Sequence, residues 1–194
     1  MINIITGFGK TGEHLSQHRL VSKISFTGST EVGYLIMRNS HKHNLKPITL
    51  ELGGKSANII LPDCDLDEAA NQACILFSNC GQSCIAGSRT YVHKSIYKQF
   101  VEKCVAIANE IKVGDPFNGA SQLGAIISKE QFEKVLSYIE DGKKEGATLM
   151  AGGERVGNKG YFLRPTIFAG VTEKMKIARE EIFGPVMCIL EWED

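Results

Sequence analysis

Short β-rich runs and longer amphipathic runs take turns along the chain. The β-rich runs, which predict strands, occupy residues 2–6, 23–27, 48–51 and 57–61. The longer runs place apolar residues three and four positions apart, which predicts helices over residues 31–39, 66–77, 94–112 and 129–145. Strands that alternate with helices of this length predict an α/β fold built on a mainly parallel sheet.

Caps and glycines mark the boundaries between these elements. The helix predicted over residues 66–77 follows Asp63 and Asp65, and either aspartate could cap it. A shift in composition near Gly53 and Gly54 is the one domain boundary that the sequence supports. We therefore expect two domains, divided at this glycine pair.

The composition is that of a folded protein with no excess of either charge. Of 194 residues, 43% are hydrophobic and 23% are charged, which allows a packed core and argues against disorder. Lys and Arg number 22, as do Asp and Glu, so the sequence lacks the basic excess of nucleic-acid binders. The apolar run at residues 2–5 is shorter than a signal peptide core or a membrane span. We therefore expect a soluble protein with no nucleic-acid and no membrane partner.

Six cysteines are too few in a chain of this length to indicate a disulfide scaffold. With no export signal, we expect them to be reduced thiols in the cytoplasm or in mitochondria. Cys80 and Cys84 are four positions apart and His41 and His43 are two apart, but neither spacing belongs to a paired set of metal ligands. We expect no metal site.

Two glycine-rich segments have spacings typical of nucleotide-binding loops. Gly7, Gly9 and Gly12 fit the dinucleotide pattern G-x-G-x-x-G, and they also fit a plain glycine turn, because the run before them is short and starts at residue 1. Residues 53–56, Gly-Gly-Lys-Ser, are similar to the end of a phosphate-binding P-loop, but Thr49 stands where that motif needs glycine. The P-loop interpretation therefore fails.

The segment Asn-Cys-Gly-Gln-Ser-Cys at residues 79–84 follows the end of a predicted apolar helix. Cys84 lies there among glycine and small polar residues, where backbone N–H groups could bind a developing oxyanion and favour the thiolate. This pattern fits a nucleophilic cysteine, and it also fits a structural cysteine.

Glu51 is a carboxylate inside the otherwise apolar run at residues 48–52. Such a carboxylate is paired, exposed at the end of the strand, or held as a general base. Gly53 and Gly54 follow directly, which indicates a strand that ends at a cleft.

Four segments narrow these alternatives when they are considered together and in order. They are FTGSTEVG at residues 26–33, ELGGKS at 51–56, GQSCIA at 81–86 and EEIFGPV at 180–186. Together they resemble the motifs of the aldehyde dehydrogenase superfamily. The resemblance runs through the whole chain and is closest to the broad-specificity aldehyde and retinal dehydrogenases, a subgroup that residues 157–166 also resemble.

The resemblance implies a catalytic pair and a site for NAD or NADP. Cys84 matches the family's nucleophile and Glu51 matches its general base. The implied reaction oxidises an aldehyde, a small-molecule substrate, to a carboxylic acid through a thiohemiacetal and a thioester on the cysteine. The implied cofactor-binding residues are Gly28, Ser29, Gly33, Leu52, Gly53, Glu130, Gln131, Lys134, Glu181 and Phe183.

The resemblance also implies roles for three segments around the cofactor. Residues 28–33 would hold the cofactor pyrophosphate, with Ser29 as a phosphate contact, and residues 7–12 would form a connecting turn beside the cofactor. Residues 130–134 would form a helix that touches the far end of the cofactor.

The nicotinamide end of the cofactor has its own implied contacts. Glu181 would bind the nicotinamide ribose and Phe183 would pack near the ring, while Leu52 and Gly53 would supply backbone beside it.

The resemblance also gives residues 1–52 as the C-terminal part of an NAD(P)-binding domain, and residues 53–194 as a catalytic domain that is incomplete at its C-terminal end. Family members are more than twice as long and form homo-oligomers, either dimers or tetramers. Their oxyanion-binding asparagine stands in a Pro-Trp-Asn context that has no match here, because the one tryptophan is Trp192. The alternative function is therefore an inactive fragment, or a structural or interaction protein on the same scaffold. We expect no measurable activity from the 194-residue chain alone.

Overall fold

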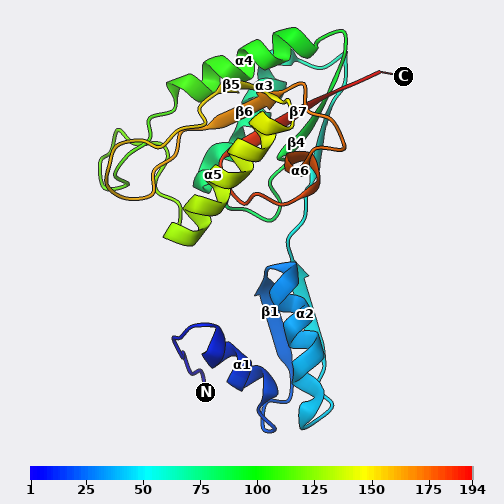
Figure 1. Ribbon diagram of the computed structural model, residues 1–194, viewed down its shortest axis with the longest axis vertical. Coiled ribbons are helices and arrows are strands. Elements are labelled where there is room, and N and C mark those ends of the chain that lie inside the picture. Colours follow the sequence, from blue (N-terminus) through cyan, green and yellow to red (C-terminus); the bar gives the residue numbers. More distant parts are fainter. Residues whose placement is uncertain (194) are drawn as a thin grey trace. The chain divides into compact units, whose positions relative to one another are not determined.

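The computed structural model describes residues 1–193, which divide into two units (Figure 1). The first unit is Met1–Gly53 and the second is Gly54–Asp194. Within residues 1–193, every helix is too short or too polar to cross a membrane.

The first unit contains a β-α-β crossover preceded by a short helix. Its elements are α1 (Gly9–Gln17), β1 (Ile24–Gly28), α2 (Thr30–Asn39), a 3-10 turn η1 (Ser40–Lys42) and β2 (Ile48–Leu52). Strands β1 and β2 pair in parallel, from Ile24 opposite Ile48 to Gly28 opposite Leu52. The two predicted runs are therefore neighbours in one parallel sheet.

Glycine allows α2 to lie close to the sheet. A Cβ at Gly33 would come within 2.9 Å of the Leu52 Cδ2 atom. Ser29 is the N-cap of α2, and its Oγ accepts a hydrogen bond from the Val32 N–H at 3.3 Å. Because side chains alternate along a strand, α2 covers the face of β2 that carries Leu52 and leaves Glu51 exposed on the other face.

The strand predicted over residues 2–6 is wrong. These residues form neither strand nor helix, and Ile2 is 91% exposed and Ile4 89% exposed. A β-rich run becomes a strand only where a neighbouring strand pairs with it, and the sheet of the first unit consists of β1 and β2 alone among the described residues.

The glycine turn predicted over residues 7–12 is also wrong, because helix α1 begins at Gly9. A distant lysine stabilises the other end of this helix. The buried Nζ of Lys46 donates hydrogen bonds to the carbonyl oxygens of Ser16 at 2.8 Å and His18 at 2.9 Å. A cation at the C-terminal end of a helix satisfies carbonyl groups that have no partner within the helix.

The second unit is built on a five-stranded sheet in the order β3-β4-β7-β6-β5. Its strands are β3 (Ala57–Ile60), β4 (Arg89–His93), β5 (Thr148–Ala151), β6 (Thr166–Ala169) and β7 (Val186–Trp192). Neighbouring strands are parallel except for β5, which is antiparallel to β6. The mainly parallel sheet confirms the predicted fold class, although the sequence pattern predicts only β3 among these five strands.

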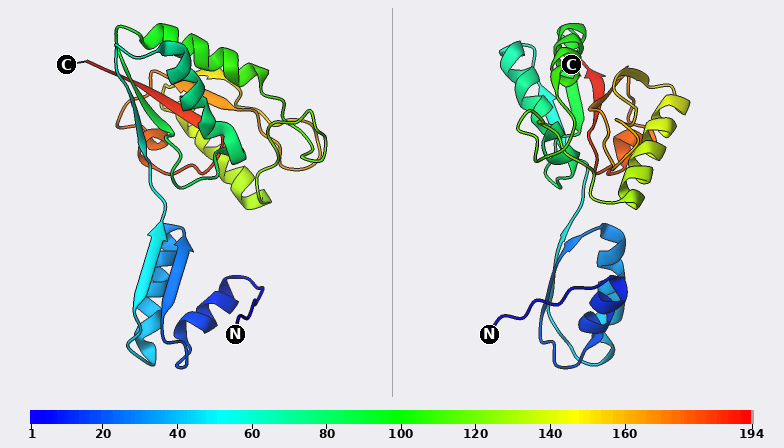
Figure 2. Two further views of the ribbon diagram at one scale, coloured as in Figure 1. Left: turned by 180° about the vertical axis from the view of Figure 1, so that it is seen from behind. Right: turned by 90° about the vertical axis from the view of Figure 1, so that its left-hand side faces the viewer.

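Helices cover both faces of this sheet (Figure 2). One face carries α3 (Leu66–Cys74) and α4 (Tyr97–Glu110), and the other carries α5 (Lys129–Lys144) and the short α6 (Lys176–Arg179). The central strand β7 contributes to both cores, with Met187 and Ile189 under α3 and α4, and Val186, Cys188 and Leu190 under α5 and α6. A strand buried on both faces is apolar without alternation, as β7 is.

The four predicted helices are confirmed, with ends that differ by up to three residues. Asp65 caps α3, because its Oδ1 accepts hydrogen bonds from the Asp67 N–H at 3.0 Å and the Glu68 N–H at 3.1 Å. The chain then tightens into the 3-10 helix η2 (Ile75–Gly81), which leads directly to the segment that contains Cys84.

Candidate active site

Three of the four motifs lead into adjacent parallel strands of the second unit. Residues 51–56 precede β3, residues 81–86 precede β4, and residues 180–186 lead into β7 (Figure 1). In the register of this sheet, Ala57 is opposite Arg89, which is opposite Cys188. The amino ends of neighbouring parallel strands meet at one edge of a sheet, so the segments that enter these strands converge at that edge.

Cys84 is exposed at the end of a loop of residues 79–84, which begins in the last residues of η2, and a run of left-handed backbone shapes this loop. Asn79 has a φ of 51°, Cys80 of 57° and Gly81 of 65°. For a residue with a side chain, this backbone conformation lowers the stability of the fold by about 1–2 kcal/mol. The two non-glycine residues therefore need support from the surrounding structure.

Hydrogen bonds supply that support. The side-chain amides of Asn79 and Gln82 each donate to the other residue's backbone carbonyl, at 3.0 and 3.1 Å. The Gln82 Oε1 atom accepts a hydrogen bond from the Ile127 N–H at 3.0 Å, and the Cys80 thiol donates to the Gly124 carbonyl at 3.2 Å. The loop is therefore fixed to the residues that lead into α5.

Gly81 brings this loop against the EEIFGPV motif. A Cβ at Gly81 would lie 2.0 Å from the carbonyl oxygen of Gly184, so a side chain does not fit there. Gly184 packs in turn on α5, where its own Cβ would lie 2.5 Å from the Val135 Cγ2 atom. The predicted nucleophile Cys84 is thus three residues from a backbone contact with the predicted cofactor motif.

Phe183 also has left-handed backbone, with a φ of 54°. The side chain of Gln131 bonds to this turn, because its Nε2 atom donates to the carbonyl oxygens of Ile182 and Phe183, both at 2.9 Å. The resemblance implies cofactor binding by Gln131, and the structure shows that both of its amide hydrogens are bonded to the protein backbone.

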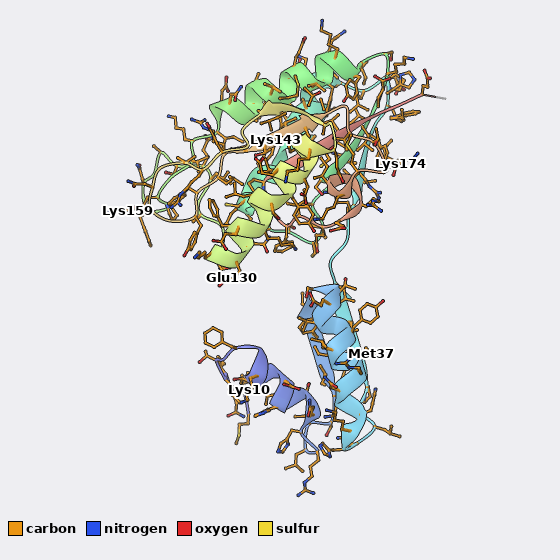
Figure 3. The ribbon with its side chains drawn as sticks, viewed as in Figure 1. Lys10, Met37, Glu130, Lys143, Lys159 and Lys174 are labelled. Atoms are coloured by element: carbon orange, nitrogen blue, oxygen red, sulfur yellow. The ribbon has the colours of Figure 1, made fainter. Side chains whose placement is uncertain are left out.

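Glu130 and Lys134 are exposed on the first two turns of α5, and Figure 3 labels Glu130 at the start of this helix. Hydrogen bonds from its own backbone N–H and from the Ser128 hydroxyl lower the pKa of the Glu130 carboxyl. The Lys134 Nζ atom lies 5.8 Å from the centre of the Tyr138 ring. Both charges are presented to solvent.

Lys55 of ELGGKS and Glu181 of EEIFGPV each carry a buried polar atom. Burial lowers the pKa of Lys55, whereas the neighbouring Cys188 and Glu181 raise it. The Lys55 Nζ and the Glu181 Oε1 are buried and have no hydrogen-bond partner within residues 1–193. Buried polar atoms in this condition are the ones that a polar ligand can satisfy.

Cys84 is the exposed cysteine among the six. Of the other five, Cys64 is half-buried and four are buried, namely Cys74, Cys80, Cys104 and Cys188. Burial raises the pKa of Cys80 and Cys188, which favours their neutral thiols. In the part of the chain that the structure describes, no three His, Cys, Asp or Glu side chains are grouped as metal ligands.

The first unit holds a cavity of about 710 Å³ between α1, β1 and α2. Its walls include Gly9 and Gly12 of α1, Phe26 of β1, and Val32 and Leu35 of α2. Polar and charged side chains, among them Glu13, Lys23 and Arg38, complete the lining, so the cavity offers both apolar surface and charge to a ligand. Gly9 and Gly12, two of the three glycines of the G-x-G-x-x-G pattern, lie in the cavity wall. The expectation of a plain turn at residues 7–12 did not predict this.

The remaining predicted residues of the first unit lie where its sheet ends. Gly28 and Leu52 are register partners at the carboxyl ends of β1 and β2, Gly53 follows, and Glu51 is exposed one residue earlier. The carboxyl ends of parallel strands are the usual place for ligands in open α/β sheets. Glu51 belongs to the first unit and Cys84 to the second.

Comparison with known proteins settles the family. The sequence model described as "Aldehyde dehydrogenase family" matches residues 1–194. The chain belongs to the aldehyde dehydrogenase family. Aldehyde dehydrogenase 1A1 of Gallus gallus is 54% identical over 195 residues, which cover 100% of this chain and 38% of that protein. Aldehyde dehydrogenase family 2 member C4 of Arabidopsis thaliana is 52% identical and is covered to 39%.

Solved structures of aldehyde dehydrogenases have the same fold. The NAD+ complex of aldehyde dehydrogenase from Bacillus cereus superposes with a TM-score of 0.93 at 50% identity, over 97% of this chain and 38% of that chain. A mutant of Aldehyde Dehydrogenase C from Pseudomonas syringae, complexed with NAD+ and octanal, has a TM-score of 0.94 at 38% identity, over 98% and 40%. The chain thus spans 38–40% of the length of these relatives.

Proposed function

We propose that this chain supplies the nucleophile, the general base and cofactor-binding residues for the NAD-dependent oxidation of an aldehyde to a carboxylic acid. One observation carries the proposal: the exposed Cys84 stands on a loop whose Gly81 touches Gly184 of the predicted cofactor motif. Membership of the aldehyde dehydrogenase family and the NAD+ held by two similar structures support it.

Residues of each unit, taken by itself, fit a part of an NAD molecule. The partly apolar cavity between α1 and α2 has room for an adenine ring, and the N-terminal end of α2, which follows the N-cap Ser29, offers backbone N–H groups to a pyrophosphate. The buried Oε1 of Glu181 can accept a hydrogen bond from a ribose hydroxyl. Bound NAD would supply the hydride acceptor that converts the adduct on Cys84 to a thioester.

Cys84 performs the first covalent step. Its thiolate attacks the aldehyde carbon and forms a C–S bond, and the carbonyl oxygen becomes an oxyanion. The backbone N–H of Cys84 donates a hydrogen bond to that oxyanion. Hydrogen bonds of Asn79 and Gln82 fix the loop that carries Cys84. The Cys84 N–H is therefore held in position for the oxyanion without rearrangement of the loop.

Glu51 acts after the thioester has formed. Its carboxylate takes a proton from a water molecule, and the water oxygen attacks the thioester carbon. The C–S bond then breaks, the carboxylic acid leaves and the thiolate of Cys84 is restored. The exposed position of Glu51 near the end of β2 gives its carboxylate access to water.

The proposal extends to the partners of the whole protein. Its substrate would be a small-molecule aldehyde and its cofactor NAD. It would work as a homo-oligomer, a dimer or a tetramer, in the cytoplasm or in mitochondria. The equal numbers of 22 basic and 22 acidic residues support the expectation of no nucleic-acid partner.

A chimera tests the proposal. Residues 1–194 replace the matching part of Gallus gallus aldehyde dehydrogenase 1A1, the relative with 54% identity. We expect the chimera to reduce NAD when it is supplied with an aldehyde, and Cys84→Ala to abolish this activity. Cys64→Ala, which changes a half-buried cysteine, is the matched control and should leave the rate unchanged. Activity of the Cys84→Ala chimera would overturn the proposal, and a folded but inactive unmodified chimera would favour the inactive scaffold.

A further inference from the structure

Residues 124–135 contact two of the motifs of the second unit, GQSCIA at residues 81–86 and EEIFGPV at residues 180–186. This segment consists of the loop before α5 and the first two turns of the helix. Its loop part holds the segment that contains Cys84, through the Gln82 and Cys80 bonds. Its helical part holds the turn at Phe183.

One amide group of α5 bonds to both sides of that turn. The carbonyls of Ile182 and Phe183 belong to the two peptide groups that flank the Phe183 Cα, and both accept from the Gln131 Nε2 atom at 2.9 Å. Because both peptide planes are bonded to a single nitrogen, the backbone torsions between them are fixed. The left-handed φ of 54° at Phe183 is held in this way.

The rest of α5 keeps Gln131 in place. Its backbone N–H donates to the Ser128 Oγ, the N-cap of the helix, at 3.2 Å. Residues four apart lie on the same face of a helix, so Val135 faces the same turn and packs on Gly184. One polar and one apolar contact from a single face of α5 therefore hold the turn at Phe183.

We propose that Gln131 is a positioning residue for the cofactor. It holds Phe183 in the left-handed turn and thereby sets the direction of Phe183 and of Glu181, two residues earlier. Because both of its amide hydrogens are bonded to the backbone, it acts on the cofactor through this turn. The cofactor roles of Phe183 and Glu181 in this inference rest on the proposed function. The hold of Gln131 on the turn rests on the geometry alone.

Unfolding of the 194-residue chain tests the hold on the turn. Gln131→Met keeps the length of the side chain and removes both donors, and Phe183→Gly removes the steric cost of the left-handed backbone. We expect Gln131→Met to lower the midpoint of thermal unfolding by about 5 °C in the unmodified chain. In the Phe183→Gly background it should lower the midpoint by less than half as much. Equal losses in the two backgrounds would overturn the proposal, and Gln131→Asn serves if Gln131→Met does not fold.

Kinetics of the chimera test the action on the cofactor. We expect Gln131→Met to raise the KM for NAD about tenfold and to leave the alkylation rate of Cys84 by iodoacetamide unchanged. Gln82→Met is the matched change, because Gln82 bonds to the loop part of residues 124–135. It should alter the alkylation rate of Cys84 instead. Glu133→Met, on the exposed side of α5, should alter neither quantity. An unchanged KM for NAD would overturn the cofactor role of Gln131, whereas an inactive unmodified chimera counts only against the proposed function.

Discussion

Gly81 leaves no room for a side chain, and its φ of 65° is a second reason for glycine. Gly81→Ala must displace the Gly184 carbonyl, so we expect it to lower the free energy of unfolding by about 2–4 kcal/mol. Urea unfolding measures this change. Gly119→Ala is the matched control, because nothing lies within 4 Å of a Cβ at that position. Equal stability of the Gly81→Ala and Gly119→Ala variants would show that the contact is not tight.

Exposure makes Cys84 the most accessible of the six thiols. We expect iodoacetamide to label Cys84 first, then the half-buried Cys64, because a thiol reacts only when the reagent reaches its sulfur and its thiolate is populated. The buried Cys188, whose pKa is raised by burial, should label last. Mass spectrometry of peptides from a time course gives the order. Faster labelling of Cys64 or Cys188 than of Cys84 would contradict it.

The sequence motifs name the candidate site residues, but they do not name the contacts that hold these residues in place. Cys84 and Glu51 follow from motifs that are contiguous in the sequence. The bond from Ile127 to Gln82 joins residues 45 apart, and the bond from Gln131 to the Phe183 carbonyl joins residues 52 apart. No local pattern specifies such pairs, because they depend on which elements pack together.

An ion pair joins α5 to α6, with the Lys176 Nζ 2.8 Å from the Asp141 Oδ2. Its hydrogen bond lowers the pKa of Asp141 from the ordinary 3.8 and raises the pKa of Lys176 from the ordinary 10.5. The carboxylate therefore adds stability above its unfolded pKa and loses it as the pH falls through its folded pKa. The lysine adds stability below its unfolded pKa and loses it as the pH rises through its folded pKa.

Removal of this pair should consequently matter at neutral pH and not in acid. We expect Lys176→Met to lower the midpoint of thermal unfolding slightly at pH 7, and to leave it unchanged at a pH well below the folded pKa of Asp141. Calorimetry at both pH values makes the comparison. A loss that is the same in acid would assign the effect to the contact between the Lys176 Nζ and the Tyr138 ring, whose centre lies 4.8 Å away.

The helices could be predicted because their signals are local. Each has a repeating apolar face, and Ser29, Asp65 and Ser128 cap their helices within one turn. The strands β4 to β7 are four to seven residues long and lack alternation where both faces are buried, so their pattern is weak. Residues 2–6 have the composition of a strand but no strand beside them to pair with.

In the second unit, the order of the strands brings separate motifs to one edge of the sheet. β3, β4 and β7 are neighbours, and a motif leads into each of them, although residues 81–86 and 180–186 lie far apart in the sequence. The resemblance to a family could be recognised from the motifs in order. Their meeting at one sheet edge could not, because the sequence pattern does not predict β4 and β7, which bring the two segments together.

Release of the acyl group is the step that tests most directly whether Cys84 and Glu51 act in sequence. In the chimera, rapid mixing with NAD and an aldehyde should give steady NADH formation. Glu51→Gln should keep an initial burst of NADH near one equivalent per site and slow later turnover by about 10²–10⁴-fold, because the water loses its base. Cys84→Ala should give no burst. Steady turnover by Glu51→Gln at the unmodified rate, or a burst from Cys84→Ala, would contradict the roles of Cys84 as nucleophile and Glu51 as general base.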